Sequence, residues 1–189
     1  GSEMCIRDRS EAGLGRYNPR TGKAWRFQIP KWMKTSLHIN ILEFISCTIG
    51  IWLEILEKQK MNKKFIKIMA LTDNSSAVGW LHKSNFNPLT HGPHDVVART
   101  LANLLLESET SITSQHTPGK TNIIADSLSR DFHLPDNHLT FILKTLYPSQ
   151  VPTNLQILPT LPKEITSWIS SLKDSSISHS APPGNPGQS

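Results

Sequence analysis

Residues 115–130 join a strand end, a tight turn and a helix start in a fixed order, and this order constrains the fold more than any other feature of the chain. Pro118 and Gly119 are a strong turn signal, and Thr121 can cap the helix that follows. His116 ends the preceding strand and can overhang Asp126, which falls early in the helix. We interpret the segment as one wall of a metal site, although an ordinary capped helix with a surface aspartate would show the same pattern.

The composition is typical of one globular domain with less ordered ends, since 37% of the 189 residues are hydrophobic. The net charge of +5 is compatible with a polyanionic partner, although many basic proteins bind no nucleic acid. Two cysteines are too few for a disulfide framework, which favours an intracellular, reducing location, in cytoplasm or nucleus. We expect a soluble protein with no membrane partner, because no apolar run approaches the roughly 20 residues that cross a bilayer and the start has no signal-peptide pattern.

The order of elements predicts an α/β layer. Apolar residues recur at helical spacing over residues 41–58, and Asn40 with Glu43 three residues on imitates the capping box that opens a helix. Residues 65–71 are a hydrophobic, β-rich run typical of a buried central strand, and polar residues begin where it stops. The predicted elements are strands at 12–17, 23–29, 65–71 and 111–116, and helices at 41–58, 75–83, 95–107 and 121–130. Such an order indicates a mixed sheet with helices packed against it.

The character of the chain changes beyond about residue 131. Two short helices are expected at 139–147 and 163–172, joined by a proline-rich linker. The second is amphipathic and too small to fold alone, so we expect it to dock on another part of the protein. We therefore divide the chain into a main domain at 10–132, a helical extension at 133–173 and a disordered tail at 174–189.

Three carboxylates in different elements carry the predicted chemistry. Glu43 lies in the first turn of the long helix, Asp73 follows the central strand, and Asp126 lies in the helix after the Pro-Gly turn. Ligands in α/β sheets usually bind at strand ends, which is where Asp73 falls. Clusters of carboxylate oxygens select Mg²⁺ or Mn²⁺ over zinc, and two such ions about 4 Å apart can hold a scissile phosphate. The pattern therefore predicts a metal-dependent nuclease.

Each of these residues also has a simpler interpretation. Glu43 is explained equally well by a helix cap and the helix dipole, and Asp73 with Asn74 by a turn that caps a helix. His116 is also compatible with a surface histidine. The tryptophans favour a core over base-stacking platforms: Trp25, Trp52 and Trp80. The joint order of the acidic residues over more than eighty positions favours a shared site.

Residues 116–130 closely resemble the C-terminal signature of ribonuclease H domains in retrotransposon reverse transcriptases, especially those of gypsy-type and DIRS-type elements. Residues 39–44 look like the glutamate-bearing helix of that family, and residues 71–78 like its strand-end aspartate and the polar turn after it. The resemblance covers about residues 10–130.

The resemblance implies a ribonuclease H-like, mixed five-stranded sheet flanked by helices and hydrolysis of the RNA strand of an RNA-DNA hybrid. By it, two Mg²⁺ or Mn²⁺ ions are bound by Glu43, Asp73 and Asp126, and His116 assists water activation or product release. The residues that would contact the substrate strand are Asn74, Ser75 and Asn122. The implied partners are the hybrid and an upstream polymerase domain of the same polyprotein.

The start of the chain departs from the family pattern. The family's first strand carries a further metal-binding aspartate shortly before Gly-x-Gly, and Asp8 precedes Gly13-Leu14-Gly15 at about that spacing. Residues 2–9, however, resemble a translated sequencing adapter and lack the apolar character of a central strand. We therefore expect residues 1–9 to be a non-native start, the first strand to be incomplete and Asp8 to be only a provisional ligand.

Two other functions compete with this interpretation. A catalytically inactive ribonuclease H-like tether, or nucleic-acid-binding domain, occurs in some reverse transcriptases, but the presence of all three carboxylates argues against it. A DNA nuclease or integrase would keep the same fold. Integrase-type sites usually end in a helix-borne glutamate, so Asp126 favours ribonuclease H.

Overall fold

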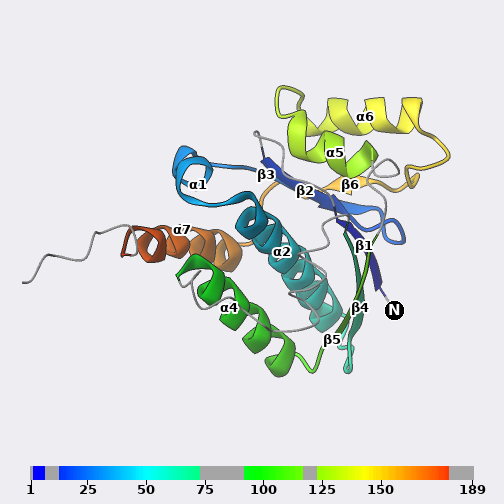
Figure 1. Cartoon of the computed structure of the whole chain (residues 1–189). Helices are drawn as coiled ribbons and strands as arrows, with labels where there is room; N and C mark the ends of the chain where they lie inside the picture. Colours follow the sequence, from blue (N-terminus) through cyan, green and yellow to red (C-terminus); the bar gives the residue numbers. More distant parts are fainter. Residues whose placement is uncertain (1, 7–12, 73–91, 117–122, 179–189) are drawn as a thin grey trace, which may run out of the picture.

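The computed structural model describes residues 2–6, 13–72, 92–116 and 123–178, which form a mixed sheet with helices on both faces (Figure 1). The strands run in the order β5-β4-β1-β2-β3-β6. Their bounds are β1 Ser2–Ile6, β2 Gly13–Tyr17, β3 Lys23–Gln28, β4 Lys67–Thr72, β5 Ser111–His116 and β6 Gln156–Ile157. The predicted α/β class is confirmed. The predicted number of five strands is wrong, because the short β6 adds a sixth strand beside β3.

Three parallel strands form one half of the sheet. Strand β4 pairs in parallel with β1 on one side and with β5 on the other. The register places Ile6 opposite Thr72 and Thr72 opposite His116, so the three strands end in one row. Strand β1 lies in the centre of the sheet, although residues 2–6 lack the apolar character that we expected there. Strand β1 is held there by main-chain pairing with β4, which does not require apolar side chains.

The other half of the sheet is the predicted hairpin, β2 and β3, closed by a loop at residues 18–22. The side-chain oxygen of Asn18 accepts hydrogen bonds from the backbone N–H groups of Arg20 and Thr21, at 2.9 and 3.2 Å. Gly22 has a φ of 70°, a conformation that glycine adopts without strain. This is the local turn chemistry that the loop composition indicated.

The helices are α1 Lys31–Ser36, α2 Ile39–Lys60, α4 Pro93–Glu107, α5 Ile123–Arg130, α6 Asp136–Leu146 and α7 Lys163–Ser178. The predicted capping box at the start of α2 is wrong. The N-cap is His38, whose Nδ1 accepts a hydrogen bond from the backbone N–H of Asn40 at 3.3 Å. The predicted helix at 75–83 lies outside the described residues.

Each face of the sheet has its own core. Leu14 of β2 and Trp25 of β3 belong to the core beneath α2, α4 and α7. Tyr17 and Ala24, which point to the opposite face, belong to the core beneath α5 and α6. Figure 1 shows α2, α4 and α7 on one side of the sheet and α5 and α6 on the other. The β2–β3 half of the sheet is thus covered on both sides, and helices from both faces are positioned relative to these two strands.

Helix α2 is long and apolar enough to cross a membrane by length and composition, contrary to our expectation that no such run exists. Of that apolar stretch, 61% is buried inside the protein. Its buried side chains include Ile45, Ile49 and Ile55, which pack with residues of α4 and α7. The core helix of a globular domain has the same composition, so the length and hydropathy are explained by packing.

The C-terminal extension is part of both cores. Ile165, Ile169 and Leu172 of α7 are buried in the core beneath α2, and Trp168 donates a hydrogen bond from Nε1 to Thr100 Oγ1 of α4 at 3.0 Å. On the other face, α6 contributes buried leucines and β6 pairs with β3. The second predicted helix therefore docks on the domain itself. Helix α7 extends to Ser178, so residues 174–178 are helical, contrary to the expected disorder from 174.

We predict that Ile169→Ala lowers the free energy of unfolding by about 2–5 kcal/mol, because the side chain is 3% exposed and its removal leaves a cavity in the core. Urea denaturation measures the change. The exposed Ser167→Ala in the same helix is the matched control and should alter stability by less than about 0.5 kcal/mol. Equal effects of the two substitutions would mean that α7 does not pack as described.

Candidate functional site

The candidate site begins at the row where β1, β4 and β5 end, which the register marks with Ile6, Thr72 and His116. The backbone of His116 closes β5 at this edge, as predicted. Five predicted site residues lie outside the described residues: Asp8, Asp73, Asn74, Ser75 and Asn122. Asp73 is the next residue of the chain after Thr72, the last residue of β4.

Glu43 lies in α2, and only 2% of its surface is exposed. The N-cap of α2 is His38, so Glu43 does not form the expected capping box with Asn40. Beneath Glu43 lies Arg16 of β2, which is 1% exposed and whose Nη2 is 3.5 Å from the backbone oxygen of Glu43. Arg16 also donates from Nε to Ser46 Oγ at 2.8 Å and from Nη2 to Cys47 Sγ at 3.2 Å. The arginine therefore fixes the start of α2 to the sheet.

The other described carboxylate, Asp126, lies in α5 and is 30% exposed. Arg130, one turn further along the helix, brings Nε to 2.9 Å from Asp126 Oδ1. Asp126 Oδ1 is buried, and among the described residues it has this ion-pair partner but accepts no hydrogen bond. A buried carboxylate oxygen without a donor is costly, and a bound cation or a further donor would remove that cost.

Two glycines of β2 allow α5 to approach the sheet. A Cβ atom at Gly15 would lie 2.6 Å from the backbone carbon of Leu128 and 2.8 Å from the backbone nitrogen of Ser129. A Cβ atom at Gly13 would lie 2.1 Å from the ring of Phe132. Both positions require the absence of a side chain, which explains the Gly-x-Gly pattern of the sequence in physical terms.

Strand β2 thus links the two described carboxylates. Gly15 contacts α5 on one face, and Arg16, the next residue, contacts α2 on the other. Glu43 and Asp126 therefore lie on helices that pack against the same strand from opposite sides. Among the residues that the structure describes, no three His, Cys, Asp or Glu side chains come together to hold a metal ion, and the predicted ligands Asp8 and Asp73 are outside that set.

His94 is a buried residue close to this region that we did not predict. It lies at the start of α4, is 5% exposed, and its ring centroid is 5.3 Å from that of Phe44, the neighbour of Glu43. Loss of hydration lowers the pKa of His94, and the charge of Asp95 opposes this shift. Its position in an Asn/Pro/His/Gly-rich stretch gave no periodic signal of burial, although Pro93 before it is a signal of a helix start.

The tryptophans are core residues where the structure describes them. Trp25 is 5% exposed, and Trp52 packs edge-on against Trp168 with ring centroids 5.9 Å apart. Trp80 lies outside the described residues. The preference for a core over a base-stacking role is confirmed for Trp25.

A cavity of about 270 Å³ lies between β3, the second half of α2 and the chain around β6. Its lining is mainly apolar, and the ion pair between Lys23 and Glu57 is part of its wall. The hydrogen bond from Lys23 lowers the pKa of Glu57. The cavity includes none of the predicted site residues, so it is separate from the carboxylates.

We predict that Gly15→Ala lowers the free energy of unfolding by about 1–3 kcal/mol, because the new methyl group overlaps the backbone of α5. Urea denaturation measures the loss. Adding Leu128→Ala should not restore stability, since two of the three nearest atoms belong to the backbone and the third is the Cβ atom of Leu128, which alanine retains. Unchanged stability of Gly15→Ala would mean that α5 does not approach β2 as closely as described.

We predict that stability falls as the pH decreases below about 6.5, the ordinary histidine pKa. The pKa of His94 is lowered in the folded protein, so the unfolded chain binds its proton more readily. This contribution is fully present above the unfolded pKa and is lost as the pH falls toward the folded pKa. Thermal unfolding between pH 7.5 and 5 measures the slope.

The His94→Gln variant should lose part of this pH dependence, even if it is less stable at every pH. The exposed His138→Gln variant should keep the wild-type dependence. Identical slopes for wild type and His94→Gln would contradict the assignment.

Comparison of the chain with protein-family models, with curated proteins and with solved structures found no match in any of the three.

Proposed function

We propose that the chain is a ribonuclease H-like domain of a retroelement reverse transcriptase polyprotein, and that it hydrolyses the RNA strand of RNA-DNA hybrids. A mixed sheet with helices on both faces agrees with the fold that the resemblance of residues 116–130 implies. The same proposal gives the chain an upstream polymerase domain and an intracellular place of action.

The row of strand ends carries this proposal. Ile6, Thr72 and His116 are level with one another, and Asp73 is the next residue of the chain after Thr72. The carboxyl ends of parallel strands are where α/β folds bind their ligands. A nuclease site that uses Asp73 and His116 would therefore form at this end of the three strands.

The described carboxylates fit a site for Mg²⁺ or Mn²⁺. Asp126 has a buried oxygen without a hydrogen-bond donor among the described residues, and Glu43 is 2% exposed. Glu43, Asp73 and Asp126 would hold two ions, with Asp8 as a provisional fourth ligand. When bound, such ions stabilise the charge that develops on a phosphodiester and lower the pKa of bound water.

The remaining side chains would act on the substrate and on protons. His116 would accept or donate a proton at a ring nitrogen beside the reacting phosphate. The amides of Asn74 and Asn122 and the hydroxyl of Ser75 would donate hydrogen bonds to the nucleic acid strand. Arg130 would release Asp126 when a cation replaces its guanidinium.

We predict that Asp73→Asn reduces Mg²⁺-dependent cleavage of the RNA strand by at least about a hundredfold. Loss of one ligand charge removes several kcal/mol of transition-state stabilisation, and each 1.36 kcal/mol is tenfold in rate. Hybrid binding should change little, because phosphate contacts elsewhere supply most of the affinity. A labelled hybrid measures cleavage by gel and binding by fluorescence anisotropy.

The matched control is Asp174→Asn, which removes an exposed aspartate from α7. It should cleave like the wild type. Equal cleavage by wild type and Asp73→Asn would refute the assignment. A wild-type protein that binds the hybrid without cleaving it would instead support the inactive tether.

A further inference from the structure

Helix α2 ends in a turn that directs the following residues outward. The backbone N–H of Lys63 donates to the carbonyl of Lys58 at 3.0 Å, and that of Asn62 donates to the carbonyl of Gln59 at 2.9 Å. Asn62 has a φ of 52°. These are the two hydrogen bonds and the left-handed residue of a Schellman motif, which stops the helix at a fixed position.

Phe65, three residues later, is an exposed aromatic residue in a fixed backbone position. Its surface is 75% exposed and its φ is 53°, an unfavourable conformation for a bulky residue. The next residue, Ile66, is 5% exposed, and its carbonyl accepts a hydrogen bond from the N–H of Ser111 at 2.9 Å. The ring of Phe65 therefore stays in solvent while the chain beside it is anchored.

Lysines surround this ring in the sequence: Lys58, Lys60, Lys63, Lys64 and Lys67. Lys58 and Lys60 complement the dipole at the end of α2. The dipole of α2 does not account for Lys63, Lys64 and Lys67, because they lie beyond the end of the helix. These lysines are exposed and form no ion pair with any residue that the structure describes. The adjoining α4–β5 turn carries two acidic residues, Glu107 and Glu109. The three lysines outnumber them, so the net charge here is positive.

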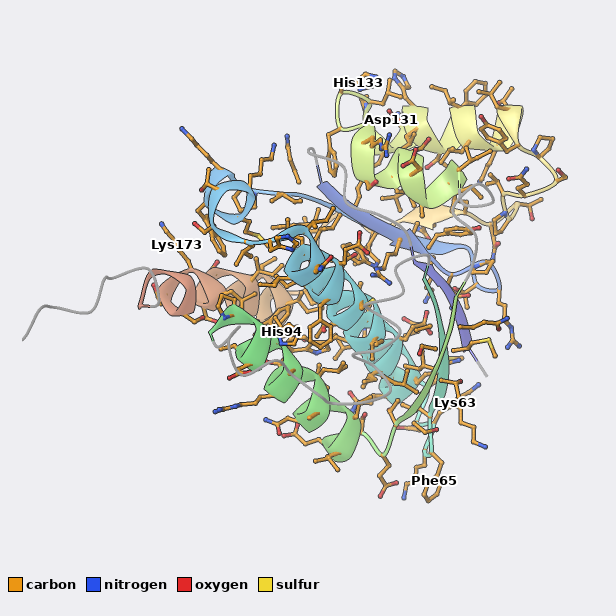
Figure 2. All side chains as sticks on the ribbon, in the orientation of Figure 1. Lys63, Phe65, His94, Asp131, His133 and Lys173 are labelled. Atoms are coloured by element: carbon orange, nitrogen blue, oxygen red, sulfur yellow. The ribbon has the colours of Figure 1, made fainter. Side chains whose placement is uncertain are left out.

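This surface, made of Lys63, Lys64, Phe65 and Lys67 and called here the Phe65 surface, lies at the start of β4. It therefore lies at the opposite end of β4 from the candidate site. Five steps along β4 separate Lys67 from Thr72, which corresponds to about 16 Å. Figure 2 shows Lys63 and Phe65 toward one end of the molecule and Asp131, just after α5, toward the other.

We propose that the Phe65 surface binds single-stranded nucleic acid. The unpaired lysines would contact successive phosphates, and a base would stack on the exposed ring of Phe65. Single-strand-binding surfaces combine these two features, a positive track and an aromatic platform, and need no sequence-specific hydrogen bonds. A strand held here would lie on the same sheet as the candidate site but away from its carboxylates. The proposal does not depend on cleavage.

The test is binding of a fluorescein-labelled 15-nucleotide oligothymidylate, measured by anisotropy in EDTA over a series of salt concentrations. The variant carries Lys63→Gln, Lys64→Gln and Lys67→Gln. Loss of three phosphate contacts should lower the slope of log affinity against log salt by about 2, since each single-strand contact contributes about 0.7. The control carries Lys31→Gln, Lys34→Gln and Lys163→Gln on α1 and α7, with the same change in net charge, and should keep the wild-type slope.

The ring is tested separately. Phe65→Ala should weaken binding by about tenfold, the loss of one stacked base, whereas Phe65→Trp should retain it. Because the ring is exposed, both variants should keep the wild-type far-ultraviolet circular dichroism spectrum.

Three results would overturn the proposal. The first is an equal loss of binding in the two triple variants, which would indicate net charge alone. The second is unchanged binding by Phe65→Ala. The third is binding of vesicles that contain phosphatidylserine without binding of the oligonucleotide, which would indicate a membrane surface. Because EDTA prevents metal-dependent cleavage, each result is independent of the Asp73→Asn experiment.

Discussion

The arrangement of the helices depends on two adjacent residues of β2. Gly15 has no room for a side chain, and Arg16 buries a positive charge. Gly15 lets the backbone of α5 approach the sheet. Arg16 is buried against α2, where Ser46, Cys47 and the carbonyl of Glu43 accept its hydrogen bonds. A buried guanidinium is tolerated only with such partners. The two helices that carry the described carboxylates are thus positioned by adjacent residues.

Local patterns predicted much of the fold. The alternation of the hairpin, the hydrophobic run of β4 and the helical spacing of α2 and α4 all reappear within about two residues of the expected bounds. Strand β6 has only two residues, too few for any periodicity, and its pairing with Lys23 and Ala24 depends on the folded hairpin. Strand β6 was not predicted for this reason, and the six-residue helix α1 was not predicted either.

The site was less accessible to sequence reasoning. The motif pointed to Glu43 and Asp126 as candidate ligands. The capping interpretation of Glu43 used four neighbouring residues, whereas its burial results from the sheet beneath it. Arg16 carries no local mark of burial, because arginines in strands usually face water. His94 was missed in the same way. The environment of each residue is created by elements distant in the sequence, which a local pattern does not report.

The apolar character of α2 has a consequence for synthesis of the chain. Its cover comes from α4 and α7, and α7 ends about 120 residues after α2 does. At roughly 5–20 residues per second, a ribosome needs about 6–24 s to make that stretch. During this interval the apolar segment of α2, similar in length to a membrane-spanning helix, is exposed on the nascent chain to chaperones and targeting factors. Burial of α2 therefore depends in part on a helix that is translated long after α2 itself.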